Sequence, residues 1–516
     1  MLVLVSRAMV LGALAALLGA CSPTKEPSAL ERVRAAGVLR WGGDVQGGEP
    51  FVSGDPRSGH LVGFEVQIAD AIARELGVRA EFVQSDWSNL VPSLERGAFD
   101  VAMNGLEVTE AKIGRVAFTR PYYVFAERLM ARRDDPSVTP DLGSLKGRRV
   151  GTLASSLAFE MLRGTAETLP YEGTSEAYTD LVDGRSDAVL LDDIIAARYG
   201  MTRPELRVVG DLRDGYYAIA ARPTDADLAE AIDAAIAGIT ASGELRRILE
   251  GHGLWNERQE RLLSWSTADQ TKMLGRPPPP PPLGMDHLGL FVRSALVTLG
   301  VSAFAMVLGA IPLGLALAVA RLYGGRLLSS AASLYVEIYR GTPVLLQLYV
   351  LYYGITPPCE RALATLLSFL GSSHRPQIPA VVIAIVGLGM NYAAYEAEVY
   401  RGAIQAVPLA QNEAALALGM PLRLTLRRII LPQALRFAVP NVTNDFIALL
   451  KDSSLVSVIT VVELTKQMTI TAVDVRTWIG PGLLCAGLYF AMSYPLGLLA
   501  RRLERRLGGE RMEASS

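Results

Sequence analysis

The sequence predicts a multidomain fold in which a soluble α/β domain precedes an all-helical transmembrane domain. The chain has 516 residues, of which 50% are hydrophobic and 20% are charged. Up to Pro282 it carries 31 Lys and Arg against 39 Asp and Glu, a net charge of −8, and the remainder carries 19 against 13, a net charge of +6. Short strands alternate with helices in the acidic part, whereas the basic part is hydrophobic in long blocks. These features indicate a soluble part followed by a membrane part, and nothing in the charge pattern suggests nucleic-acid binding.

The N-terminus has the features of an export signal. A hydrophobic stretch, 8–20, follows Arg7 and has the length of a signal-peptide core, which is too short to span a membrane comfortably. It ends in Leu-Gly-Ala before Cys21, which resembles a bacterial lipobox, whose cysteine is lipidated. An ordinary secretory signal and an uncleaved anchor remain alternatives. We expect residues 1–21 to be a signal peptide of the lipoprotein type.

Residues 28–265 predict an α/β domain. A helix is expected over Phe64–Leu76, because Ile68 and Ile72 lie four residues apart on one face and Gly77 is placed to end it. Short strands are expected at Val38–Trp41, Ala80–Val83, Asp100–Met103 and Ala188–Leu191. Strands alternating with helices favour parallel sheets, and the length exceeds what one lobe requires.

Residues 266–286 predict a linker. The secondary-structure pattern stops at Ser266, and Pro277–Pro282 is an unbroken run of prolines. In polyproline II geometry this run would be a semi-rigid spacer of roughly 19 Å.

Residues 287–510 predict a transmembrane domain of about five spans, each with the length that a bilayer requires. The expected spans lie near 294–320, 328–354, 378–400, 437–462 and 479–500. Arginines follow the first span, fill the loop after the third and form the tail after the fifth. With five spans all these cations lie on the cytoplasmic side and the acidic domain lies outside.

The loop after the third span carries a spaced motif. Its fixed positions are Glu413, Ala414, Ala415, Gly419, Ile429, Leu431 and Pro432. The pattern predicts a helix over Gln411–Leu418, a glycine break, a second basic helix and a proline stop. It resembles the cytoplasmic EAA loop of ATP-binding-cassette (ABC) importer permeases, whereas the alternative is an ordinary amphipathic surface helix.

Three flanking segments resemble the polar amino acid branch of these permeases: Glu337–Pro343, Glu398–Gly402 and Lys451–Leu455. The resemblance implies a MetI-like permease domain in the bacterial inner membrane. It also implies a cytoplasmic ATPase that docks on the loop, and pairing with a second copy or a sister permease. The chain contains no Gly-Lys dipeptide and therefore no P-loop, so the ATPase must be a separate subunit.

Five charged residues lie in or at the ends of the expected spans. Because charges there are costly, they are candidates for the translocation path or for pairing between helices. They are Arg340, Lys451, Asp452, Glu396 and Glu398.

The first domain resembles the periplasmic binding proteins for polar amino acids. The stretches that carry the resemblance are Leu61–Glu65, Leu94–Val101, Phe118–Tyr123 and Gly184–Ala188, followed by Asp192. It implies a type II fold with two α/β lobes and hinge strands near 121–133 and 215–222. In that family an amino acid lies between the lobes.

The resemblance also implies a set of substrate-binding residues. Thr109 and Lys112 occupy the segment that holds the ligand carboxylate, and Asp192 occupies the ammonium site. Ser155 and Ser156 are expected at a helix N-terminus that assists in binding the carboxylate. Asp44, Trp87 and Gly105 complete the expected set.

Two of these positions depart from the family pattern. Lys112 replaces an arginine, and Glu107 stands where a small or hydroxyl residue is usual. Glu107 either pairs with Lys112 or faces a cationic part of the ligand. The acidic surroundings favour a cationic or amide amino acid.

The expected function is therefore amino-acid import, as the substrate-binding and permease subunit of an ABC importer. A ligand-gated channel with an amino-acid-binding domain is the alternative, although such receptors interrupt the binding domain with the pore. No catalytic, metal or cofactor arrangement is predicted, so an enzyme is not expected.

Overall fold

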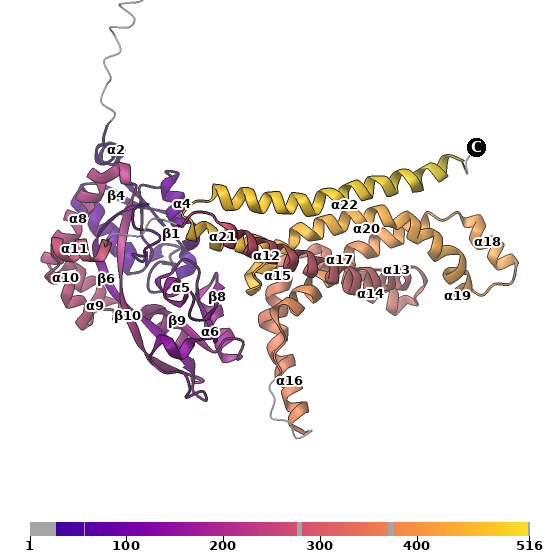
Figure 1. The fold of residues 1–516 in the computed structure, drawn as a ribbon, viewed down its shortest axis with the longest axis horizontal. Coiled ribbons are helices and arrows are strands. Elements are labelled where there is room, and N and C mark those ends of the chain that lie inside the picture. Colours follow the sequence, from indigo (N-terminus) through magenta and orange to yellow (C-terminus); the bar gives the residue numbers. More distant parts are fainter. Residues whose placement is uncertain (1–26, 56, 276–280, 370–375, 514–516) are drawn as a thin grey trace, which may run out of the picture. The chain divides into compact units, whose positions relative to one another are not determined.

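The computed structural model describes residues 27–55, 57–275, 281–369 and 376–513 (Figure 1). It divides into two compact units, which are described separately. The first contains residues up to Ala126 and Arg213–Pro277, and the second contains Glu127–Leu212 and everything from Pro278 onward. The predicted signal peptide with Cys21, and most of the proline run, lie outside the described residues.

The first unit contains half of the predicted α/β domain. Its strands follow the order β4-β1-β5-β10, with β1 parallel to both β4 and β5, and β10 antiparallel to β5. The bounds are β1 Val38–Gly43, β4 Arg79–Gln84, β5 Val101–Ala102 and β10 Leu206–Ala221. The first three confirm the predicted strands, and their parallel pairing confirms the α/β class.

Helix α3 (Phe64–Leu76) has the predicted bounds. Ile68 and Ile72 are buried as expected. Gly77 adopts a left-handed conformation with φ 76°, and its N–H caps the last carbonyls of the helix. Gly63 has φ 143°, and a Cβ there would lie 2.0 Å from the Phe51 carbonyl oxygen, so only glycine admits this entry into the helix.

This unit also contains helices α2 Ala29–Ala36, α4 Leu90–Glu95, α8 Ala226–Ala241, α9 Glu244–Gly251 and the short α10 Glu260–Leu263. Helices α8 and α9 pack against α3, and α4 packs against β5 and β1.

One helix lies where a structureless linker was predicted. Helix α11 (Thr267–Leu274) begins with a capping box, in which the Ser266 hydroxyl accepts the Asp269 N–H and the Asp269 carboxylate accepts the Ser266 N–H. The prediction that regular structure ends at Ser266 is therefore wrong. None of the side chains of α11 is fully buried, and its apolar Met273 and Leu274, which pack against the core, both lie in its last turn, so its sequence shows little helical periodicity.

The second unit begins with the other half of the α/β domain. Strand β7 is parallel to β8 and β9, and β9 is antiparallel to β6. The elements are β6 Ala117–Arg132, β7 Arg149–Leu153, α5 Leu157–Leu162, β8 Glu167–Tyr171, α6 Thr174–Val182 and β9 Ala188–Asp192. The predicted strand at Ala188–Leu191 is confirmed. The expected hinge strands fall within β6 and β10, along which the chain passes from one unit to the other.

The rest of the second unit is helical. Its main elements are α12 Met285–Phe304, η7 Ala305–Ala310, α13 Ile311–Tyr323, α14 Arg326–Gly341, α15 Val344–Tyr349, η8 Val350–Ile355, α16 Thr356–Phe369, α17 Ala380–Gln405, α20 Leu431–Asp452, η10 Ser453–Ile459, α21 Leu464–Asp474 and α22 Ile479–Glu513.

Among the described residues, three helical segments are long and apolar enough to cross a membrane: Met285–Tyr323, Ala380–Gln405 and Ile479–Arg502. They correspond to the first, third and fifth predicted spans. The prediction of an uninterrupted second span over 328–354 is wrong, because α14 ends at Gly341 and a Thr-Pro step separates it from α15. The fourth predicted span corresponds to α20, which carries four charged residues and is not among these three segments.

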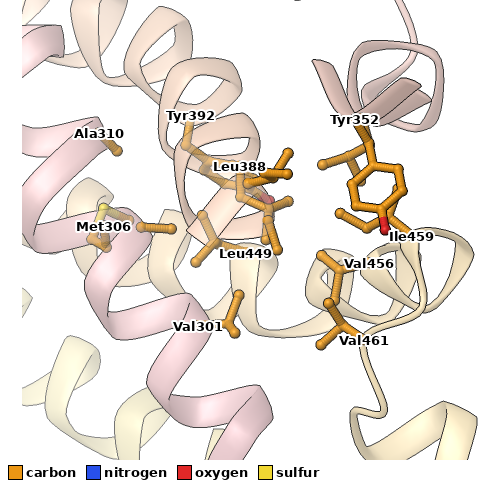
Figure 2. Packing of buried hydrophobic residues seen from close by; sticks show 14 residues of the cluster. Val301, Met306, Ala310, Tyr352, Leu388, Tyr392, Leu449, Val456, Ile459 and Val461 are labelled. Atoms are coloured by element: carbon orange, nitrogen blue, oxygen red, sulfur yellow. The ribbon is translucent and has the colours of Figure 1, made fainter. Parts of the chain in front are cut away.

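The membrane helices share a hydrophobic core. Figure 2 shows side chains from α12, η7, α17, α20 and η10 that gather in one cluster. Beside it, Gly309 of η7 faces Gly389 of α17, and a Cβ on Gly309 would lie 2.8 Å from the Gly389 Cα. Two glycines at the crossing therefore let the helix backbones approach closely, as is common in membrane bundles.

We expect Gly309→Leu to destabilise the permease helices by about 1–3 kcal/mol, because the added side chain forces the crossing apart. Thermal unfolding of the purified chain in detergent measures the change. Gly300→Ala is the matched control, since no atom lies within 4 Å of a Cβ there. Equal melting temperatures for wild type and Gly309→Leu would contradict close packing at this crossing.

Candidate functional site

The first half of the candidate site lies at the carboxyl ends of β1 and β5. Asp44 directly follows β1 and is 6% exposed. Its carboxylate accepts hydrogen bonds from the Gln46 N–H, the Gln84 Nε2 and the Trp87 N–H, each at 2.9 Å. Asp44 therefore ties together the segments that follow β1 and β4.

Trp87 and Lys112 contact each other. The Trp87 Nε1–H donates to the Asn104 carbonyl at 3.0 Å, which fixes the orientation of the indole. The Lys112 Nζ lies 5.1 Å from the centroid of that ring, within the range of a cation–π interaction. The structure thus brings together two residues that the resemblance had placed in one site.

The segment after β5 carries the other predicted residues of this half. It is held by backbone hydrogen bonds to β10, from the Val108 N–H to the Tyr216 carbonyl at 3.0 Å and from the Ala218 N–H to the Leu106 carbonyl at 3.1 Å. Glu107 lies opposite Tyr217 in this pairing and is 4% exposed.

Gly105 begins this segment with φ +55°, and a Cβ there would lie 2.9 Å from the Phe51 ring. Its N–H donates to the Glu65 carboxylate at 2.6 Å. Since that donor is already used, any direct contribution of Gly105 to ligand binding would come from its carbonyl.

Thr109 ends the segment with an unusual feature. Its side chain is 1% exposed, yet its hydroxyl has no hydrogen-bond partner among the described residues. A buried hydroxyl without a partner is unfavourable in the folded protein. Thr109 therefore offers a hydrogen-bonding group that a ligand could satisfy.

The remaining predicted residues lie in the second unit. Ser156 caps α5, as its hydroxyl accepts the Phe159 N–H at 3.0 Å and donates to the Leu153 carbonyl at 2.8 Å. Ser155, just before it, has φ 65°, an uncommon conformation for a residue with a side chain. Asp192 follows β9 and caps the next turn through the Ile195 N–H at 2.8 Å.

Sequence reasoning missed two residues that organise the first half. Glu65 and Asn104 are both buried and hydrogen-bonded to each other and to predicted site residues. A signal existed for Glu65, because it lies on the same face of α3 as Ile68 and Ile72. A carboxylate inside an apolar stripe is seldom there for packing alone.

The predicted coupling motif forms a helical hairpin in the second unit. Helix α18 (Leu409–Ala417) ends in a Schellman motif, with Gly419 at φ 76°, its N–H on the Leu416 carbonyl and the Met420 N–H on the Ala415 carbonyl. Glu413 and Ala414 are exposed, whereas Ala415 is buried. The predicted helix and glycine break are confirmed.

The predicted proline stop is wrong. Helix continues from α19 (Leu422–Thr425) through η9 (Leu426–Ile430) into α20, with Pro432 in its first turn. Proline normally disrupts a helix because it lacks an N–H and clashes with the preceding turn. Here η9 is a π-helical turn, whose wider hydrogen bonding accommodates the proline. Ile429 and Leu431 are partly buried at this junction.

The hairpin exposes large apolar side chains. Leu409, Leu416 and Leu418 are 78%, 52% and 81% exposed. Leu409 and Leu416 belong to α18, as does the exposed Glu413, and Leu418 directly follows this short loop helix, which Figure 1 labels. An apolar cluster with a polar neighbour is typical of a protein interface.

The charged residues of the membrane helices are largely paired with each other. Glu398 accepts from Arg321 at 2.6 Å and from Arg401 at 2.7 Å, and Arg340 lies 3.8 Å away. Asp452 accepts the Tyr392 hydroxyl at 2.7 Å. These contacts favour helix pairing for Glu398 and Asp452.

Two charged residues of that set have other surroundings. Glu396 is buried where α17 packs against α13, and Lys451 is exposed. No contact observed for either residue assigns it to a translocation path.

Two family models match the chain. Residues 42–254 match the bacterial extracellular solute-binding proteins of family 3, and residues 310–509 match the inner membrane component of binding-protein-dependent transport systems. Over 216 residues the chain is 31% identical to a putative glutamine transport system permease protein from Rickettsia bellii. The alignment covers 42% of the chain and 92% of the relative. The chain belongs to the binding-protein-dependent transport permeases. It joins a solute-binding domain and an inner-membrane permease domain in one polypeptide.

Other permeases of the family are similar. The octopine transport system permease protein OccQ of Rhizobium radiobacter is 34% identical, covering 42% of the chain and 89% of that protein. The arginine transport system permease protein ArgU of Corynebacterium glutamicum is 40% identical, covering 32% of the chain but only 50% of that protein.

Among solved structures, an ancestral arginine-binding protein bound to arginine is 31% identical, with a TM-score of 0.39. That match covers 42% of the permease chain and 98% of the ancestral protein. Because the TM-score is below 0.5, the family assignment depends on the sequence matches alone.

We expect Thr109→Val to leave the free energy of unfolding unchanged or to raise it by up to about 1 kcal/mol, because it removes a buried hydroxyl that has no partner. Thr119 is the matched control, since its hydroxyl donates to the Arg120 carbonyl and accepts the Ile219 N–H. Thr119→Val should cost about 1 kcal/mol. Chemical denaturation without ligand measures both, and a large loss for Thr109→Val would show that its hydroxyl is already satisfied.

Proposed function

We propose that this permease chain is both the receptor and the membrane subunit of an ABC importer for a polar amino acid. The observation that carries the proposal is the exposed coupling hairpin of α18 in a chain that also contains a solute-binding domain. The exposed Leu409 and Leu416 of α18, with Leu418 directly after it, suit a hydrophobic groove on a partner protein. The partner that we propose is a separate cytoplasmic ATPase, since the chain has no P-loop of its own.

A polar amino acid fits the first half of the site. The Thr109 hydroxyl and the Lys112 ammonium are three residues apart, and both suit a carboxylate ligand. Glu107 adds a buried negative charge that favours a cationic or amide side chain in the ligand. Relatives named as arginine, glutamine and octopine permeases support this class. From the resemblance we expect Asp192 to bind the ligand ammonium and Ser155 and Ser156 to lie near its carboxylate.

The proposal also covers the domain boundaries of the chain and its pairing with a second permease subunit. We assign a signal peptide to residues 1–21, with lipidation at Cys21, and place the solute-binding domain at 28–265. The linker, at 266–286, then includes α11, and the permease domain is 287–510. A second copy of the chain, or a sister permease, completes the pore, because closed two-fold assemblies are the commonest solution for such half-pores.

The channel alternative predicts a pore inserted within the binding domain. The two family matches instead follow one another along the chain without interleaving. This order favours the importer.

Ligand binding is testable on the full chain in lipid nanodiscs. In a thermal-shift panel of the common amino acids, we expect L-arginine or L-glutamine to stabilise the chain by about 2–3 kcal/mol at a hundredfold excess over Kd. Thr109→Val should lower the affinity about tenfold, because a hydrogen bond to the ligand is lost. If no amino acid stabilises the chain, the assigned ligand class is wrong.

Coupling is testable in proteoliposomes that contain the chain and its ATPase. Glu413→Ala and Gly419→Pro should each reduce ATP-driven uptake more than about tenfold, the effect expected for an interface hot spot. Solute binding should be unchanged in both variants. Gln411→Ala, an exposed position on the same helix, is the control. Loss of solute binding together with uptake would place the coupling site elsewhere.

A further inference from the structure

Glu65 is a buried carboxylate that forms no ion pair with any of the residues that the structure describes. It lies in the first turn of α3 and is 0% exposed. Its Oε1 accepts the Tyr122 hydroxyl at 2.5 Å and the Gly105 N–H at 2.6 Å, and its Oε2 accepts the Asn104 Nδ2 at 3.3 Å. All three partners are neutral. Burying a charge in this way is costly unless its hydrogen bonds are made.

The partners of Glu65 lead directly to the candidate site. Asn104 uses its Oδ1 to accept the Asp44 N–H and its backbone carbonyl to accept the Trp87 Nε1–H, both at 3.0 Å. Gly105 begins the segment that ends at Thr109. One carboxylate thus holds both the loop after β1 and the segment after β5.

We propose that Glu65 is a positioning residue for solute binding. Its carboxylate contacts Gly105 and Asn104 and, through them, fixes the residues that we expect to touch the solute. The proposal rests on the proposed function of this site. It assigns to Glu65 no direct contact with the solute.

The negative charge is needed because of how the hydrogen bonds are distributed. Oε1 already accepts two donors, so a neutral acid or amide would place its own donor at Oε2, facing the donor group of Asn104. Turning the Asn104 amide would remove that clash, but its NH₂ group would then face the Asp44 N–H. Only the carboxylate satisfies every donor at once.

The titration of Glu65 therefore has a predictable direction. Burial raises the pKa of Glu65 to about 7. The carboxylate predominates above that pKa, so solute affinity should rise as the pH rises through about 7. Folding has the opposite dependence, because a raised carboxyl pKa means that stability is greatest in acid and falls as the pH rises through about 7.

The neighbouring titratable groups are separable from Glu65. Tyr122 of β6 stays neutral, because burial and the Glu65 charge raise its pKa well above the usual value. His252, whose ring lies 6.3 Å from Phe64, has a pKa lowered by burial. Asp44 is linked to Glu65 through Asn104, whose Oδ1 accepts the Asp44 N–H. His252 and Asp44 are retained in a Glu65 variant, so any pH dependence that they cause persists there.

The test is equilibrium binding of L-arginine and of L-glutamine to the full chain in nanodiscs between about pH 5.5 and 8.5, a range that brackets the Glu65 pKa. Wild-type affinity should fall about tenfold toward the acid end, the effect of losing one charge-assisted hydrogen bond. Glu65→Gln should bind about tenfold more weakly than wild type at the basic end and show no dependence between these limits. Asp70→Asn, at an exposed position on the same helix, should behave as wild type.

Asn104→Ala is the second variant. This variant retains Glu65 but removes the side-chain hydrogen bonds that link Glu65 to Asp44. It should therefore bind the solute about as weakly as Glu65→Gln. A wild-type affinity that does not change with pH, or a Glu65→Gln variant that binds like wild type, overturns the positioning role while leaving the binding function intact. If neither probe binds wild type, the proposed substrate class fails, and the positioning role fails with it.

Discussion

The first half of the site depends on one buried carboxylate that is stabilised by neutral donors. Within the described part of the chain Glu65 forms no salt bridge, and its charge is compensated by a hydroxyl, a backbone N–H and a side-chain amide. Such an arrangement is sensitive to geometry, because each donor must be in place for the charge to remain buried. Because its hydrogen bonds require fixed positions of the donors, Glu65 holds Gly105, the first residue of the segment from Gly105 to Thr109, in place. Strand β10 holds the same segment through backbone hydrogen bonds.

In the permease domain, the corresponding constraint is close contact between helix backbones. Gly309 faces Gly389, and Gly314 faces Glu396, where a Cβ on the glycine would lie 2.5 Å from the glutamate Cβ. In a bilayer, lipid and side chains are equally apolar, so close packing and paired polar groups hold helices together. The ion pair of Glu398 in α17 with Arg321 in α13 contributes the polar part of this packing.

The coupling hairpin combines a rigid end with an exposed surface. The Schellman turn at Gly419 fixes where α18 ends, and the helix then continues through Pro432 into α20. A displacement of α18 would therefore reach α20 through a short, ordered connection. Exposed leucines would be a liability on an isolated loop, which is why their presence indicates a partner surface.

Much of this organisation was predictable from sequence. The spacing of Ile68 and Ile72 with Gly77 set both ends of α3, because apolar periodicity and glycine capping are local properties. The break before Pro343 also had a local signal, since a residue before proline avoids helix. By contrast, α11 has apolar contacts only through Met273 and Leu274 of its last turn among the core contacts observed, and the continuation through Pro432 follows a π-helical turn that no spacing rule predicts.

The sequence by itself determined the order of domains, the α/β and helical classes, the coupling motif and the residue types of the site. The order of domains and the two fold classes follow from charge and periodicity, whereas the coupling role of the motif and the residues of the site come from the resemblance of short stretches to known families. Only the tertiary structure decided that the Thr109 hydroxyl has no hydrogen-bond partner among the described residues, that the Gly105 N–H donates to Glu65, and that Glu65 joins both loops. These are contacts between residues as far apart as 40 positions, and hydrogen bonds at that separation are set by how strands and helices pack rather than by neighbouring residues.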